Sequence, residues 1–135
     1  RFNFTVINAT TNGISRVQWG RSGDVNDLAN LDAKGIGIRV DNLALKGLAH
    51  NGTSLTVVNL NTTLVAGTTY RMRIVSDGAG NVEWFLDGVS KGTSAAGPSS
   101  AGSLPNTSIQ ITAENGADAV QFQLDISLPT IDVYQ

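Results

Sequence analysis

Acidic side chains are the first candidates for chemistry, because retaining glycoside hydrolysis needs two carboxyl groups about 5 to 5.5 Å apart. The only glutamates in the chain are Glu83 and Glu114. Glu83 stands between Val82 and Trp84, and the nearest carboxylate along its predicted strand, Asp87, lies at a turn. We therefore expect no catalytic pair of acids.

The single histidine gives no stronger sign of catalysis. His50 lies in Ala49-His50-Asn51 beside a predicted turn, and the sequence contains no Gly-x-Ser-x-Gly motif of the kind that positions a serine nucleophile. We expect His50 to be an exposed residue that flanks the turn. Taken with the missing acid pair, this predicts that the protein is not an enzyme.

One loop carries enough oxygen ligands to raise the question of calcium. The segment 20–32 contains Asp24, Asn26, Asp27 and Asp32, whose oxygens are the hard ligands that Ca²⁺ prefers. Their spacing does not match an EF-hand loop, and Asp and Asn are also ordinary turn formers. The favoured interpretation is a solvated loop without metal or other cofactor, with a calcium site as the alternative.

Aromatic and arginine side chains form the candidate glycan site. Sugar binding uses an exposed aromatic face with a few fixed polar partners. Phe85 is predicted to point outward beside Arg71 and Arg73, and Trp19 is either the edge of the core or a ligand platform. The sequence predicts a glycan site made of Trp19, Arg71, Arg73 and Phe85, with Trp84 in the core.

Asn-x-Ser/Thr triplets occur at Asn3, Asn8, Asn51, Asn61 and Asn106. In a secreted eukaryotic protein they could carry glycans. In a bacteriophage protein they would be a by-product of a β surface rich in Thr and Asn.

The elements that must position these residues read as strands. Apolar residues alternate in short runs, whereas no window repeats them at helical spacing. The runs are Phe2/Phe4/Val6, Val17/Trp19, Ile36/Ile38/Val40, Leu43/Leu45, Leu55/Val57, Tyr70/Met72/Ile74, Val82/Trp84/Leu86, Ile109/Ile111, Val120/Phe122/Leu124/Ile126 and Ile131/Val133. About ten strands separated by Gly, Asn and Asp turns predict an all-β fold of two antiparallel sheets. The 135 residues fit one domain, residues 1–135, which we expect to be part of a longer polypeptide.

The segment 70–88 predicts a hairpin around Asp77-Gly78-Ala79. Residues on the same face must pair, so the predicted register sets Met72 opposite Trp84, with Ile74 opposite Val82 and Tyr70 opposite Leu86. On the outer face it sets Arg73 opposite Glu83 and Arg71 opposite Phe85. A second hairpin is expected to turn at Asp87-Gly88.

The stretches YRMRIVSDGAGNVEWFLDGV, GIGIRVDNLALKGLAHNGTSLTVVNL and QFQLDISLPTIDVYQ resemble the concanavalin A-like lectin and glucanase superfamily. More narrowly, they are similar to laminin-G-like domains of bacteriophage tail, fibre and head-surface proteins. The resemblance implies a jelly-roll β-sandwich. Glucanases of the superfamily use a Glu-x-Asp-x-(x)-Glu cluster on one strand, which this chain lacks, so the resemblance implies the fold rather than that chemistry.

These observations predict a non-enzymatic structural domain on a virion, as a capsid decoration or a fibre or tail module that adheres weakly to glycans. The alternative is a carbohydrate-binding, lectin-like module of a secreted, extracellular adhesin. The expected partners are other virion proteins or copies of itself, including a homotrimer, with the loop from Ser94 to Leu104 docking, and cell-surface glycans. The net charge of −2 argues against nucleic acid, and no apolar run is long enough for membrane insertion.

Overall fold

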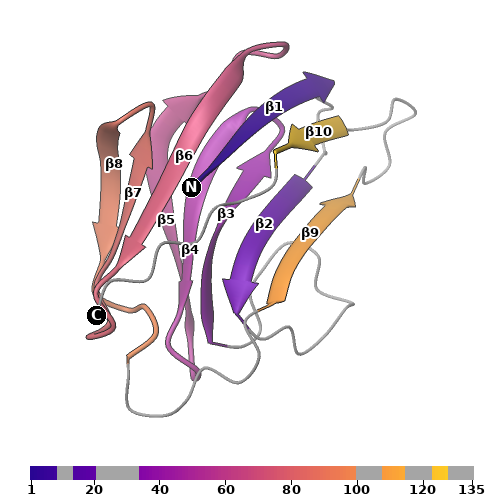
Figure 1. Ribbon diagram of the computed structural model, residues 1–135. Coiled ribbons are helices and arrows are strands. Elements are labelled where there is room, and N and C mark those ends of the chain that lie inside the picture. Colours follow the sequence, from indigo (N-terminus) through magenta and orange to yellow (C-terminus); the bar gives the residue numbers. More distant parts are fainter. Residues whose placement is uncertain (9–13, 21–33, 100–107, 115–122, 128–135) are drawn as a thin grey trace.

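The computed structural model describes residues 1–8, 14–20, 34–99, 108–114 and 123–127. These residues form strands joined by turns (Figure 1). The strands are β1 (Phe2–Asn8), β2 (Ile14–Gly20), β3 (Gly35–Asp41), β4 (Ala44–His50), β5 (Leu55–Thr63), β6 (Thr69–Ser76), β7 (Val82–Leu86), β8 (Val89–Ser94), β9 (Ser108–Glu114) and β10 (Gln123–Ile126).

The strands pair into two antiparallel sheets of five strands each. Sheet I has the order β10-β1-β6-β7-β8, and sheet II has the order β5-β4-β3-β2-β9. The two sheets stack as layers, with β6 and β1 in front of β4 and β3 in Figure 1. This arrangement confirms the predicted fold class, an all-β antiparallel sandwich.

Sheet I is held together by its first strand, which lies between two segments from distant parts of the sequence. Thr5 pairs with Thr69 of β6 on one side and with Asp125 of β10 on the other. Beyond the end of β10, the backbone of Asn3 accepts a hydrogen bond from Ser127 N at 2.9 Å and donates one to Ser127 Oγ at 2.8 Å. The N-terminal strand is therefore an interior strand of its sheet.

The core fills the space between the sheets and follows the period-two pattern of the sequence. In β7, Val82, Trp84 and Leu86 are buried, whereas Glu83 and Phe85 between them are partly exposed. The fully buried cluster draws on both sheets and comprises Phe2, Phe4, Val6, Val17, Ile38, Val40, Leu45, Ala49, Leu60, Leu64, Met72, Val82, Trp84 and Leu86. Alternation places these apolar side chains inward and leaves two outer faces for polar residues.

Trp84 joins the two sheets, which confirms its predicted place in the core. The side chain is fully buried, and its indole Nε1 donates a hydrogen bond of 2.8 Å to the carbonyl oxygen of Gly37 in β3. Gly47 of β4 leaves room for the ring, since a Cβ atom at that position would lie 2.6 Å from Trp84 Cε2. One side chain of sheet I thus rests on the bare backbone of sheet II.

The hairpin between β6 and β7 has the predicted faces but a different register. Met72 pairs with Leu86 and Ile74 with Trp84, a shift of two residues from the predicted pairing that keeps every side chain on its expected face. Arg73 consequently pairs with Phe85, and Val75 takes the place opposite Glu83. The predicted pairs Arg73–Glu83 and Arg71–Phe85 are therefore wrong.

The shift arises because the loop spans residues 77–81 rather than three residues. Asp77 Oδ1 accepts hydrogen bonds from the backbone N–H groups of Ala79 (2.8 Å) and Asn81 (3.0 Å), and Asp77 Oδ2 accepts one from the side-chain amide of Asn81. Gly78 and Gly80 both have positive φ, which the longer loop needs. The next turn is as predicted: Asp87 and Gly88 have φ of 50° and 86°, typical of a two-residue type I′ hairpin.

Asp77 should make the stability of this loop depend on pH. The hydrogen bond from Asn81 and then the one from Ala79 hold the pKa of the Asp77 carboxyl below its usual value of 3.8. A lowered pKa means that the carboxylate stabilises the folded state above pH 3.8 and that this contribution is lost as the pH falls through the folded-state pKa. Urea unfolding of wild type and Asp77→Ala should therefore differ near neutral pH and converge at lower pH. A difference that stays constant with pH would contradict this role.

The segment after β8 packs on its own domain at first. The amide of Gly97 donates a hydrogen bond of 2.8 Å to Gly80 O, Ala79 and Ser99 form an antiparallel bridge, and Gly97 and Pro98 are buried. Residues 100–104, the rest of the loop expected to dock onto partners, lie outside the described residues. Docking through this loop stays a prediction.

Candidate functional site

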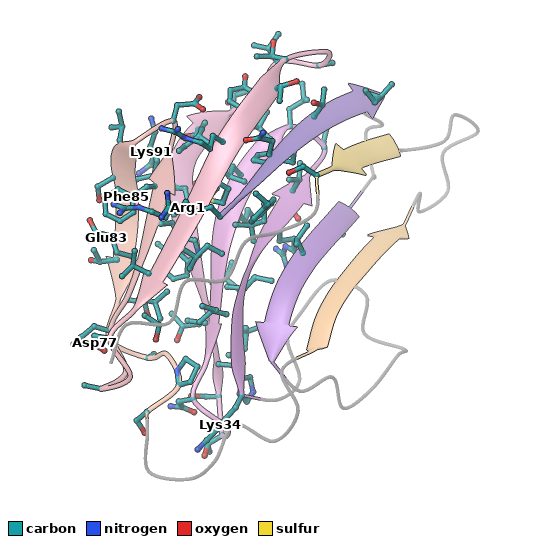
Figure 2. All side chains as sticks on the ribbon, in the orientation of Figure 1. Arg1, Lys34, Asp77, Glu83, Phe85 and Lys91 are labelled. Atoms are coloured by element: carbon teal, nitrogen blue, oxygen red, sulfur yellow. The ribbon has the colours of Figure 1, made fainter. Side chains whose placement is uncertain are left out.

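The structure brings three of the four predicted glycan-binding residues together. Arg71 and Arg73 of β6 and Phe85 of β7 share the outer face of sheet I, where Figure 2 shows Phe85 beside Glu83. Trp19 belongs to β2 of sheet II, where its backbone pairs with Ile36 and Ile109. The four residues therefore do not form one site.

The exposed aromatic ring on sheet I already has a partner. The guanidinium carbon of Arg73 lies 4.0 Å from the centroid of the Phe85 ring, an arrangement that contributes about 0.5 to 1 kcal/mol at exposed sites. A sugar could stack on that face of the ring only by displacing Arg73. The arginine side chains themselves are exposed, as expected of a solvated outer face.

The outer face of sheet II is different, and the sequence analysis did not consider it. Over β3 and β4 it carries Gly35, Gly37, Arg39, Asp41, Lys46, Leu48 and His50, which alternate with core residues. We call these seven residues the recessed face. Direct pairing sets Lys46 beside Arg39, Leu48 beside Gly37 and His50 beside Gly35.

Burial distinguishes this face from its counterpart on sheet I. Leu48 is completely buried and His50 is 6% exposed, and the Arg39 side chain is 15% exposed, although all three lie on the side of the sheet away from the core. Arg71 and Arg73 at equivalent outward positions of sheet I are exposed. Polar side chains of sheet II thus lie in a recess, where they can reach a ligand but are partly shielded from water.

An ion-pair cluster fixes the charged groups of the recessed face. Asp41 contacts Arg39 twice, with Nε–Oδ1 at 2.7 Å and an Nη2 hydrogen bond to Oδ2 at 2.9 Å. The ammonium of Lys46 lies 2.9 Å from the same Oδ2. Two cations share one carboxylate, so the three residues carry a net charge of about +1 at neutral pH and hold each other in defined orientations.

His50 is buried at the end of β4, which corrects the prediction that it is exposed. Its Nδ1 accepts a hydrogen bond of 2.9 Å from the backbone N–H of Gly52, so the neutral ring carries its proton on Nε2. The turn behind it is closed by the Asn51 amide, which donates to Ser54 O at 3.3 Å. The residue flanks a turn as expected, but the turn folds back over the imidazole.

Several sequence candidates lie outside the described residues, namely Asp24, Asn26, Asp27, Asp32 and Asn106. Within the described ranges, no three His, Cys, Asp or Glu side chains gather in a way that could hold a metal ion. In those same ranges, no helix is long and apolar enough to cross a membrane. Asn3, Asn51 and Asn61 are exposed.

No protein-family model matches the chain, and no curated protein matches it. A solved structure that is similar is the crystal structure of an endo-β-1,4-glucuronan lyase from the fungus Trichoderma reesei, with 17% sequence identity and a TM-score of 0.48. The match covers 90% of this chain and 54% of that chain, so this chain spans about half the length of that protein. At this identity the likeness concerns the fold alone.

This comparison corrects one prediction and leaves another where it was. The prediction that the chain is not an enzyme is overturned, because the matched structure is that of an enzyme. The prediction rested on the missing acid pair and serine motif, and their absence argues only against hydrolases that use them. The phage part of the sequence resemblance finds no counterpart in this match.

The sequence held a signal for the recessed face. Ile36, Ile38 and Val40 mark the inner face of β3, so the intervening residues had to face outward. Among these, Arg39 and Asp41 follow two glycines. The pattern of β4 is harder to interpret, because Leu48 is apolar but lies on the outer face, and it obscures the alternation.

Proposed function

We propose that this domain binds a carbohydrate chain on the recessed face of sheet II. The observation that carries the proposal is the partial burial of Arg39, Lys46 and His50 on the side of the sheet away from the core. Sugar-binding sites combine concavity with a few polar groups in fixed positions. Guanidinium, ammonium and imidazole N–H groups are donors for the many hydroxyl and ring oxygens of a glycan.

Rigidity supports the same function. Asp41 orients both Arg39 and Lys46, and the Gly52 amide orients His50. Groups that are already oriented lose little conformational entropy when a ligand arrives. Gly35 and Gly37 add no side chains beside them, which leaves the floor of the recess low where a sugar ring would lie.

The proposal keeps the lectin-like alternative of the sequence analysis but moves its site. On sheet I the aromatic face is covered by Arg73, whereas sheet II offers oriented polar groups. Display on a virion, and an extracellular location, stay predictions that this proposal does not need.

The test is to map binding with neutral and acidic oligosaccharides by ¹⁵N–¹H NMR titration. We expect the largest shift changes at backbone amides of β3 and β4, with little change in β6 and β7. Arg39→Gln should weaken binding about tenfold, because a hydrogen bond from a charged group contributes about 1.5 to 3 kcal/mol.

The matched control is Arg73→Gln, the same substitution on sheet I, which should leave the affinity unchanged. Thermal unfolding of both variants checks that the fold is retained. Shift changes centred on β6 and β7 and lost in Arg73→Gln would instead place the site at the residues first predicted. No shift changes with any oligosaccharide would refute the proposed function.

A further inference from the structure

We infer that the ligand of the recessed face is an acidic glycan, whose sugar carboxylates bind along a row of basic residues that crosses three strands. This inference rests on the proposed function and specifies its substrate class. The row begins with Arg39 and Lys46, which are direct cross-strand partners in β3 and β4. On the other side of β3, the register places Arg16 of β2 opposite Arg39.

The row is long enough to meet more than one sugar unit. Neighbouring strands lie about 4.8 Å apart, so the positions of Arg16, Arg39 and Lys46 extend roughly 10 Å across the sheet. Gln18 and Gly37 form the adjacent pair in the same register. A chain of sugars lying across the strands would therefore pass one basic position at each strand.

The charge balance of this surface is opposite to that of the protein. Like charges at directly opposed positions of a sheet repel each other, and here three basic positions stand in one row. The outward positions of the neighbouring row in β9, β2 and β3 contribute two acidic residues, Glu114 and Asp41, with Ile14 between them. The sum is about +1 at neutral pH, whereas the whole chain carries −2.

Partial burial increases the effect of this excess. The side chains of Arg39 and Lys46 are 15% and 30% exposed, so water and salt screen their charges less than those of exposed residues. An added carboxylate would relieve the repulsion along the row, which favours an anionic ligand. The overall negative charge opposes a densely charged polyanion such as nucleic acid, so spaced sugar carboxylates fit better.

The experiment compares oligogalacturonate, oligoglucuronate and oligomannuronate with their carboxyl-reduced, neutral forms by isothermal titration calorimetry. Reduction changes only the carboxylate. We expect at least one uronate to bind at least about tenfold more tightly than its reduced form, and its affinity to fall as salt increases. Lys46→Gln should remove most of that preference and reduce the salt dependence. Lys91→Gln in β8 of sheet I is the matched control and should alter neither.

The outcomes separate the two proposals. If reduced and acidic forms bind equally through β3 and β4, the acidic class is wrong and the proposed glycan site stands. If neither form binds, both are wrong. A heparin fragment provides the sulfate arm: tight binding to it, with no uronate binding, would overturn the carboxylate assignment.

Discussion

Trp84→Ala is expected to lower the free energy of unfolding by about 3 to 5 kcal/mol, the range for large aromatic residues removed from a core. Two losses add at this position. The fully buried ring leaves a cavity between the sheets, and the Gly37 carbonyl loses its 2.8 Å hydrogen bond from the indole. Because domains of this size are stable by about 5 to 15 kcal/mol, the variant should unfold at much lower urea concentration or fail to accumulate.

Trp84→Phe keeps the prediction testable if the alanine variant does not fold. It retains an aromatic ring but removes the N–H donor and some volume, so a smaller loss is expected. Phe85→Ala is the control on the other face of the same strand, where the side chain is partly exposed. Equal losses in Trp84→Phe and Phe85→Ala, measured by urea unfolding, would contradict the anchoring role of the indole.

Gly47→Ala is expected to lower the free energy of unfolding by about 1 to 3 kcal/mol, the usual result of overfilling a packed core. The new Cβ would lie 2.6 Å from Trp84 Cε2 and 2.7 Å from Cδ2, distances that force one of the sheets or the ring to move. In an ordinary strand the same substitution would stabilise, because glycine is a poor strand residue. The sign of the effect is therefore diagnostic.

A double-mutant cycle isolates the contact. In a Trp84→Phe background the smaller ring leaves more space, so Gly47→Ala should cost clearly less than in the wild type. A cost that is the same in both backgrounds would show that the alanine strains something other than the indole ring. Equilibrium unfolding in urea gives all four free energies.

The strands could be predicted from the sequence because burial follows alternation. The pattern Val82, Trp84, Leu86 requires a strand with one inner face, whatever it pairs with. Pairing is less determined, since a shift of two residues preserves both faces. The hairpin of β6 and β7 took the shifted register because the Asp77 carboxylate binds three N–H donors of a five-residue loop.

The site was less accessible to sequence reasoning than the fold. Alternation says which residues face outward, but not whether that outer face is solvated or recessed. Arg73 and Arg39 look alike as outward arginines in a strand, yet Arg73 is exposed and Arg39 is held by Asp41. Trp19 and Phe85 were grouped by type, and the sheet order separates them because β2 and β7 belong to different layers.

The place of β1 inside sheet I bears on how the protein is made. Thr5 is hydrogen-bonded to a residue 64 positions away, and Asn3 to one 124 positions away, so the strand that leaves the ribosome first has one of its neighbours among the last to emerge. Loop closure over such distances is slow. During translation the apolar side chains of β1 must therefore wait, unpaired, for β10, and this layer can be completed only once synthesis is nearly over.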